Sequence, residues 1–319
     1  MRLGTRVTIL ALVLLVGGCM STPQSKVLFM SPPSNLEPET LLTHVPFYPQ
    51  EKYQCGPAAL AMALSAAEVQ VTPDELFNKV YVTGKQGSYQ AELIAASRAY
   101  DRLAYVIAPD LQALLSEVSA GNPVLVLQNL GLSFAPQWHY AVVTGYDLAE
   151  RRLILHSGTI ENYRLPLKTF ERTWARSGYW GMVVTGPDRL PVTATAERLF
   201  TSLTAMQETG VKDDVLLDYF RTASDNWPGN TNLQMGYGNQ LYVMDNMDAA
   251  LEVFDRVTAS QPDYAPAFNN MAWILYQQQR YREALPHAHK ATNLGGDFSE
   301  QYRNTLALIT TALDQSSRR

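Results

Sequence analysis

The sequence predicts an α+β domain followed by an all-α repeat domain. Two observations lead to this prediction. Helix patterns precede strand patterns between residues 44 and 187, and a 34-residue period runs through the last third of the chain. With 319 residues, 46% of them hydrophobic, the chain is long enough for two domains that each bury a core of their own.

The start of the chain has the pattern of an export signal. Met1–Arg6 is basic, Val7–Val16 is apolar, and the residues directly before Cys19 are small. The apolar stretch is too short to cross a bilayer as a helix. This pattern resembles the signal of bacterial lipoproteins, which implies that residues 1–18 are a signal peptide and that Cys19 carries the lipid.

The resemblance to lipoproteins also implies a location. Met20 and Ser21 provide no acidic retention signal after the cysteine. We therefore expect the protein in the bacterial cell envelope, anchored to a membrane through its N-terminal lipid and facing the periplasm, with the outer membrane favoured. Residues 19–43 hold four prolines among serine, threonine, asparagine and glutamate residues, a composition that predicts a flexible tether.

Composition excludes several classes of ligand. The net charge is −5 and no basic cluster is present, so we expect no nucleic-acid partner. The sequence has no ligand cluster with zinc spacing and no glycine-rich phosphate loop, so we expect no metal and no organic cofactor. Cys19 and Cys55 are the two cysteines, and lipidation of the first leaves no pair for a disulfide.

In the first domain, at 44–187, helices are expected before the sheet. An Ala, Leu and Met run follows Cys55, the capping box Thr72–Glu75 starts a second helix, and Tyr89–Tyr100 is a third. Asp110 caps a fourth helix. Strands are expected at Leu103–Ile107, Pro123–Leu130, His139–Tyr146, Arg151–His156 and Tyr179–Thr185, with a helix at Lys168–Arg176 before the last one. Turn-rich separators favour an antiparallel sheet.

Residues 188–196 are expected to link this domain to a repeat domain at 197–316. Small residues, an aromatic residue and a proline recur at 34-residue intervals in that region. The pattern resembles tetratricopeptide repeats. It implies units at 197–230, 231–264 and 265–298, followed by a capping helix at Glu300–Leu313. Three units reach the minimum for a stable stack, and such stacks present a concave face, so we expect a protein partner there.

Cys55 is the candidate nucleophile. It stands at the start of a predicted helix, where the helix dipole and unpaired N–H groups should lower the pKa of its thiol. Gln50, five residues earlier, can direct its amide at an oxyanion beside the sulfur. His139 is the candidate base, because it begins a predicted strand and its ring can project toward the helix that carries the cysteine.

These residues together resemble a known family. Gln50, the segment Cys55–Leu64 and the strand His139–Asp147 look like the bacteriocin-processing, double-glycine leader peptidases and their stand-alone relatives. The resemblance covers residues 44–187. It implies a papain-like fold with the cysteine as nucleophile, the histidine as base and the glutamine in the oxyanion hole. The sequence contains no transporter, so the leader-peptide substrate of the exporters does not carry over.

The family has an acidic third residue on the next strand, and this chain has His156 there. A neutral imidazole can orient His139 and hold its tautomer. An even loop length between the two strands would put both side chains on one face of the sheet. Asp147 is an alternative, although eight residues of extended strand separate it from His139 by about 26 Å. Asn129, on the preceding strand, is a further alternative.

The sequence therefore predicts an envelope-anchored cysteine peptidase that cleaves peptide bonds in a peptide or protein substrate, with repeats that recruit a protein partner. Two other functions are open. A Cys-His-His set also resembles the papain-like endopeptidases that cut peptidoglycan stem peptides. An inactive, peptidase-like protein-binding module is the other, and the missing acidic residue favours it.

Overall fold

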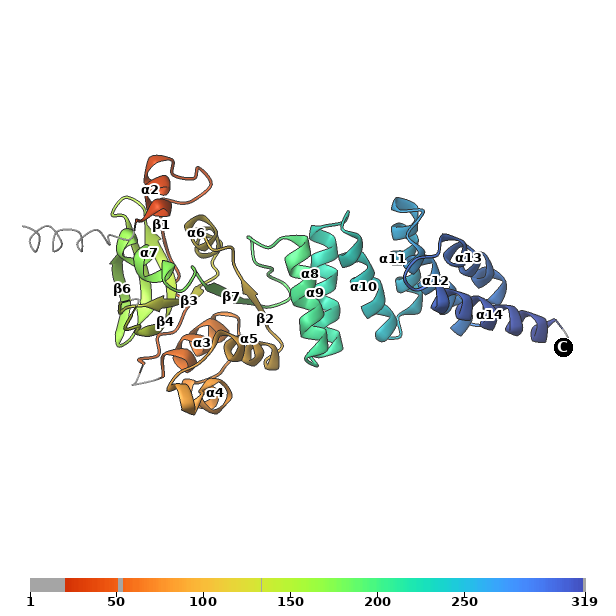
Figure 1. Ribbon diagram of the computed structural model, residues 1–319, viewed down its shortest axis with the longest axis horizontal. Coiled ribbons are helices and arrows are strands. Elements are labelled where there is room, and N and C mark those ends of the chain that lie inside the picture. Colours follow the sequence, from red (N-terminus) through yellow and green to blue (C-terminus); the bar gives the residue numbers. More distant parts are fainter. Residues whose placement is uncertain (1–20, 51–53, 133, 318–319) are drawn as a thin grey trace, which may run out of the picture. The chain divides into compact units, whose positions relative to one another are not determined.

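The structure is a computed structural model that describes residues 21–50, 54–132 and 134–317. The expected signal peptide and the lipidation site Cys19 lie outside these residues. Within them, an α+β region is followed by an all-α region, which confirms the predicted fold class (Figure 1). None of the helices in the described part of the chain has the length and apolar character needed to cross a bilayer.

A seven-stranded sheet forms the centre of the α+β region. Its strand order is β2-β7-β3-β4-β5-β6, and β1 pairs with β4 beside this path. The pairs of β4 with β1, β3 and β5 are antiparallel, as predicted. The strands are β1 (Glu39–Leu41), β2 (Leu103–Val106), β3 (Val124–Asn129), β4 (Trp138–Asp147), β5 (Arg152–Ser157), β6 (Ile160–Pro166) and β7 (Gly181–Thr185).

The helices of this region are α2 (Pro23–Met30), α3 (Cys55–Ala66), α4 (Pro73–Val80), α5 (Gln90–Ala99), α6 (Leu111–Ser119) and α7 (Leu167–Ala175), with a 3-10 turn, η2, at Thr83–Lys85. Residues 56–64 of α3 are all buried, because this helix is apolar on every side and packs on β3 and β4. The predicted capping box of α4 is present, with the Glu75 carboxylate accepting from Thr72 N and Thr72 Oγ1.

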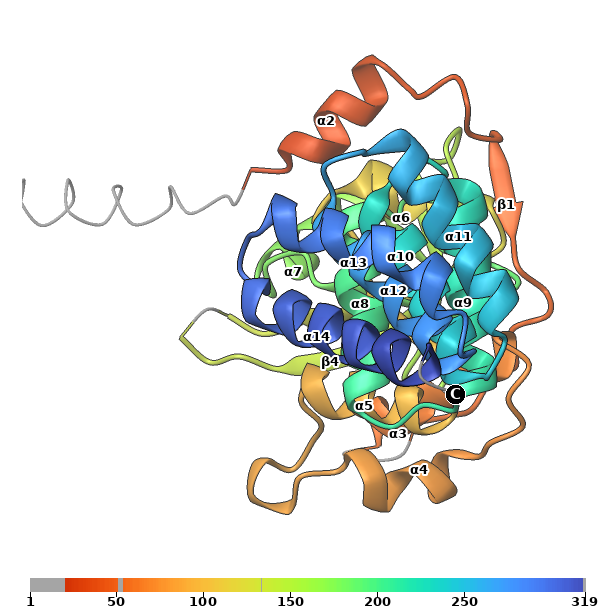
Figure 2. The ribbon, with the colours of Figure 1, turned by 90° about the vertical axis from the view of Figure 1, so that its right-hand side faces the viewer.

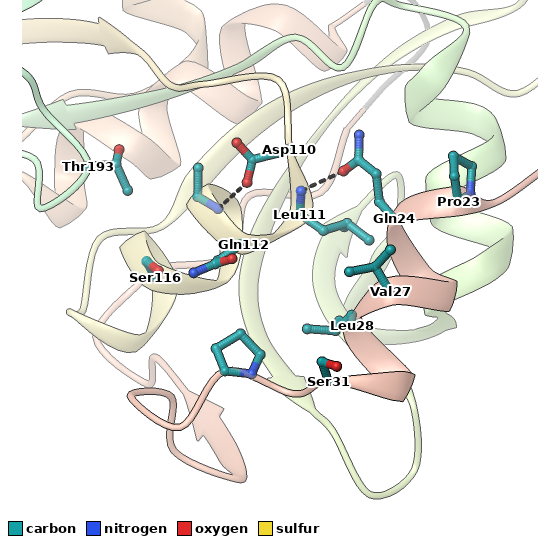
Figure 3. A pocket seen from close by; sticks show the side chains of 12 residues that line it. Pro23, Gln24, Val27, Leu28, Ser31, Asp110, Leu111, Gln112, Ser116 and Thr193 are labelled. Carbon is teal, nitrogen blue, oxygen red and sulfur yellow. Dashed lines mark hydrogen bonds between the residues drawn. The ribbon is translucent and has the colours of Figure 1, made fainter.

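The prediction of a flexible tether at 19–43 is wrong for the described part of that segment. Gln24 and Ser25 at the start of α2 donate their backbone N–H groups to the buried carboxylate of Glu171, at 2.9 and 2.7 Å. The unpaired N–H groups and the dipole at a helix start favour a carboxylate there. The Gln24 amide also accepts from Leu111 N at 2.7 Å (Figure 3).

The same segment then enters the sheet as β1. Glu39 pairs with Asp147 and Leu41 with Gly145 on β4. Figures 1 and 2 show α2 and β1 joined by a loop, with α2 near α6. Its prolines therefore begin a helix and shape a connection, since Pro23 is the first residue of α2.

The chain divides into two compact units that are not continuous in sequence. The first holds the chain up to Ala96 together with Val106–Val184 and Pro191–Thr193, and the second holds Ser97–Tyr105, Thr185–Leu190 and the chain from Ala194 onward. The expected division into 44–187, a linker at 188–196 and 197–316 is therefore too simple. The buried carboxylate of Glu117 explains part of this, because it accepts from Thr193 N at 2.8 Å and from Thr193 Oγ1 at 2.6 Å.

The second unit contains the repeat helices. They are α8 (Ala196–Glu208), α9 (Asp213–Asn226), α10 (Thr231–Val243), α11 (Met247–Ser260), α12 (Ala265–Gln277), α13 (Tyr281–Leu294) and α14 (Ser299–Ser316). The starts of α9, α11 and α13 are 34 residues apart, and so are those of α10, α12 and α14. A Cβ at Gly238 would lie 2.5 Å from the Phe254 ring, so the small residue in the repeat lets neighbouring helices approach.

Tyr219 of α9 hydrogen-bonds to the backbone of Leu103 and Thr185, which belong to the second unit together with the repeat helices. Its hydroxyl donates to Thr185 O at 2.6 Å and accepts from Leu103 N at 2.9 Å. The side chain is fully buried. Since both backbone partners lie in segments that precede the expected repeat domain, this hydroxyl accounts for part of their grouping with the repeats.

Tyr219→Phe should lower the free energy of unfolding by about 1–3 kcal/mol, because it leaves two buried backbone groups without a partner. Urea denaturation of the full chain, followed by circular dichroism, measures this change. Tyr89→Phe is the matched control, since the Tyr89 side chain is exposed. Equal stability of the two variants would contradict the assignment.

Candidate active site

Cys55 is the first residue of α3, as predicted. Gly56 follows it, and a Cβ on Gly56 would lie 2.3 Å from Ser88 Oγ and 2.6 Å from Ser88 Cβ. Ser88 is held in turn, because its carbonyl accepts from the Tyr140 hydroxyl at 3.2 Å. The glycine after the cysteine therefore lets the segment around Ser88 approach the start of α3.

Gln50 lies between the ends of β4 and β5. Its Nε2 donates to Tyr140 O at 3.2 Å, its Oε1 accepts from Gly158 N at 3.2 Å, and its backbone N–H donates to Gly158 O at 2.9 Å. The side chain is only 8% exposed. An amide nitrogen carries two hydrogens, so the bond to Tyr140 leaves one N–H of Gln50 for another acceptor.

His139 is the second residue of β4, and its Nε2 lies 2.9 Å from Ser157 Oγ. The strand register explains this partner. Val142 is opposite His156 on β5, and His139 precedes Val142 by three residues, so His139 and His156 face opposite sides of the sheet. Ser157, one residue later, faces the side of His139.

Of the residues predicted for the third position, none contacts the ring of His139 among the described hydrogen bonds. His156 is buried, with Nε2 at 3.2 Å from Val45 O and Nδ1 accepting from Asn162 N at 3.3 Å. These bonds join the segment before Gln50 to β6, so its role here is structural.

Asn129 and Asp147, the two alternatives for the third position, accept hydrogen bonds from the connections that follow their own strands. Asn129 Oδ1 accepts from Gly131 N and Gln137 N at 3.0 and 2.9 Å, which closes the connection from β3 to β4. Asp147 Oδ1 accepts from Glu150 N at 2.8 Å in the turn after β4. The sequence prediction did not include Ser157. Ser157 follows His156 by one residue, so its side chain lies on the opposite face of β5, which is the face of His139.

Burial controls the electrostatics of the site. It raises the pKa of the Cys55 thiol, and backbone hydrogen bonds from Tyr140, Gly56 and Cys55 itself lower this pKa by less. Burial also lowers the pKa of His139. The expected lowering of the thiol pKa is therefore wrong, because desolvation outweighs the helix start. Both shifts favour the neutral form of the Cys55 thiol and of the His139 imidazole at neutral pH.

Gly56→Ala should destabilise the domain by about 1–3 kcal/mol and displace the start of α3, because Ser88 cannot accommodate the methyl group without moving. Thermal unfolding and the alkylation rate of Cys55 measure the two effects. Gly56→Ala combined with Ser88→Gly removes the clash and should recover both. Failure of this second change to recover either property would contradict the packing argument.

The alkylation rate of Cys55 should rise with pH with a midpoint above that of a free thiol, about 8.5. The sign follows from the raised pKa, because alkylation requires the thiolate and a higher pKa moves the thiolate to higher pH. Iodoacetamide labelling of the full chain, monitored at Cys55 by mass spectrometry, measures the profile. A midpoint near pH 6 or 7 would instead indicate a preformed ion pair.

Known proteins match the two regions of the chain separately. Residues 42–182 match the Peptidase_C39 like family. No curated protein matches this chain. A C39-like peptidase from Bacillus anthracis matches with 20% identity and a TM-score of 0.39, over 47% of this chain and 98% of that one.

Two solved structures of helical repeats also match. The type III secretion chaperone SycD of Yersinia enterocolitica, in complex with a peptide of the translocator YopD, is 15% identical, with a TM-score of 0.35, over 38% of this chain and 93% of that one. The first TPR domain of human RPAP3 is 19% identical, with a TM-score of 0.35, over 39% and 95%. Residues 42–182 therefore resemble the C39-like peptidases, and they are followed by an all-α region whose helix starts recur every 34 residues.

Proposed function

We propose that the first domain is a cysteine peptidase that hydrolyses peptide bonds, with Cys55 as nucleophile, His139 as base and Gln50 as oxyanion donor. The observation that carries this proposal is the convergence of all three on Tyr140. Its carbonyl accepts from Gln50, its backbone lowers the pKa of the Cys55 thiol, and His139 precedes it on β4.

Proton transfer accompanies the attack, since the thiol and the imidazole are both neutral at rest. Nε2 of His139 is hydrogen-bonded to the Ser157 hydroxyl, so Nδ1 is the nitrogen that remains to take the proton from Cys55. The sulfur then adds to the peptide carbonyl carbon. The same imidazolium protonates the leaving amine, and water hydrolyses the thioester that remains.

Gln50 supplies the donor for the oxyanion of the tetrahedral intermediate. Its second Nε2–H is free of the bond to Tyr140, and the backbone N–H of Cys55 is among the N–H groups at the start of α3 that have no partner within the helix. The bonds that Gln50 makes to Tyr140 and Gly158 fix its amide before the substrate arrives. A preorganised donor of this kind stabilises developing charge without reorganisation.

The proposal extends to the location of the protein. Lipidation at Cys19 would anchor the chain in the cell envelope, facing the periplasm, with the outer membrane favoured. Because α2 begins at Pro23 and is bound to Glu171, the four residue-to-residue steps from Cys19 to Pro23 would span at most about 14 Å. The peptidase domain would then act close to the membrane surface, and the repeats would recruit a protein partner.

The other two candidate functions have less support. A Cys-His-His set would favour a stem-peptide endopeptidase, but His156 is bonded to Val45 and Asn162 instead of His139. An inactive binding module is favoured because no acidic side chain among the described residues is hydrogen-bonded to His139. Ser157 occupies that position, and a hydroxyl can hold the ring orientation although it gives the imidazolium less stabilisation than a carboxylate.

Ser157→Ala should lower kcat roughly 3- to 10-fold, because loss of one neutral hydrogen bond is worth about 1 kcal/mol. It should also move the pH profile of kcat, which a purely structural residue would not do. His156→Gln should lower thermal stability with a smaller effect on kcat. Mass spectrometry of a proteome-derived peptide library, and chromatography of peptidoglycan fragments, provide the assays.

Cys55→Ser and His139→Ala are the controls for these assays, and both should abolish turnover. Cleavage of peptidoglycan fragments alone would support the stem-peptide endopeptidase. A wild-type protein that is as silent as Cys55→Ser toward both substrates, while binding a peptide equally well, would refute the peptidase and support the binding module.

A further inference from the structure

The helices α8, α10, α12 and α14 line a groove in the second unit. It consists of two cavities of about 560 and 370 Å³. Asn239, Asn269, Asn270 and Gln301 line both cavities, so the two are parts of one groove. We call it the amide groove. Asn270 Nδ2 donates to Asn239 Oδ1 at 2.9 Å, which joins the walls from α12 and α10.

No lysine, arginine, histidine, aspartate or glutamate is among the described residues that line the amide groove. This is notable in a chain with 25 basic and 30 acidic residues. A carboxylate or an ammonium group brought into the groove would lose hydration without meeting an opposite charge, which is unfavourable. The lining therefore disfavours acidic segments, basic segments and free C-terminal carboxylates.

Asn269 is the strongest indication of a ligand. Its side chain is 3% exposed, and its Oδ1 is buried without a hydrogen-bond partner among the described residues. An unpaired buried amide oxygen costs free energy, and native structures contain few such groups. A half-turn of the amide exchanges Oδ1 and Nδ2, so Asn269 can offer a ligand either an acceptor or a donor.

Apolar side chains accompany these amides. Val243 of α10 and Leu308 of α14 line the larger cavity and are 51% and 44% exposed. Phe298 lines the smaller cavity and is 57% exposed. Large apolar side chains around a polar centre suit a segment whose backbone is polar and whose side chains are apolar.

We propose that the amide groove binds an extended, uncharged and partly apolar peptide segment of a partner protein. The side-chain amides pair with its backbone N–H and C=O groups, and the exposed apolar residues contact its side chains. A peptide group offers one donor and one acceptor, which a side-chain amide matches with one acceptor and one donor. This inference rests on the partner expected for the repeats in the proposed function, and does not depend on catalysis.

The test uses the full chain with Cys55→Ser, so that no bound segment is cleaved. The probe is a synthetic array of dodecapeptides of random composition, each prepared with an amidated and with a free C-terminus. The bound peptides should be depleted of charged residues, and the amidated form should bind at least as well as the free acid. Binding should change little between low salt and about 0.5 M salt, because no ion pair forms.

Asn269→Leu should weaken binding of the selected peptides at least roughly 10-fold, since it removes the central amide. The same variant should unfold at an equal or higher temperature, because it also removes a buried group without a partner. Asn293→Leu, an exposed position on α13 outside the groove, is the matched control. Gln301→Leu, on the exposed side of α14, gives a second variant that does not depend on a buried position.

Four outcomes would overturn the proposal. They are the absence of any enriched peptide, a charged residue required at a fixed position, a requirement for the free carboxylate, and full binding by both Asn269→Leu and Gln301→Leu. Peptidase activity of the wild-type chain is measured separately. Loss of binding with intact peptidase activity would therefore contradict this inference alone, and loss of activity with intact binding would contradict the peptidase alone.

Discussion

The placement of Gln50 between the ends of β4 and β5 is the interaction on which the candidate active site depends. At Tyr140 and Gly158 its side chain takes the place of a direct strand-to-strand bond, and its backbone adds a third link. The strands can therefore separate where the nucleophile enters without leaving these groups unpaired. His139 and Ser157, which hydrogen-bond to each other, stand next to Tyr140 and Gly158 in the chain, so Gln50 holds the two strand ends that carry this pair.

Strand register sets which side chain supports the base. For His156 to contact His139, both side chains would have to lie on one face of the sheet. The observed pairing of His156 with Val142 places them on opposite faces, and the neighbouring Ser157 contacts His139 instead. A carboxylate at this position would favour an imidazolium, whereas a hydroxyl holds the ring without adding charge. Together with burial, which raises the pKa of Cys55 and lowers that of His139, this favours proton transfer during attack over a preformed ion pair.

Local signals predicted the helices better than they predicted the edges of the fold. The capping box at Thr72 and the 34-residue spacing of helix starts depend on residues that are close in sequence, so both could be predicted from the sequence alone. The docking of α2 depends on Glu171, which lies far away in the chain, and a proline-rich composition gives no sign of it. The strand β6 escaped prediction because only one of its seven residues is buried, so it lacks the alternating pattern of a half-buried strand.

The two proposed peptide sites, one in each unit, share the use of side-chain amides and differ in how these amides are held. In the first, Gln50 is fully positioned by Tyr140 and Gly158, which suits a donor that must be in place when charge develops. In the second, Asn269 has no described partner and can rotate, which suits recognition of a backbone in either polarity. A positioned amide favours catalysis at one bond, and an unpaired amide favours binding of many sequences. An uncharged groove would therefore select a segment by its extended backbone and apolar character more than by its individual residues.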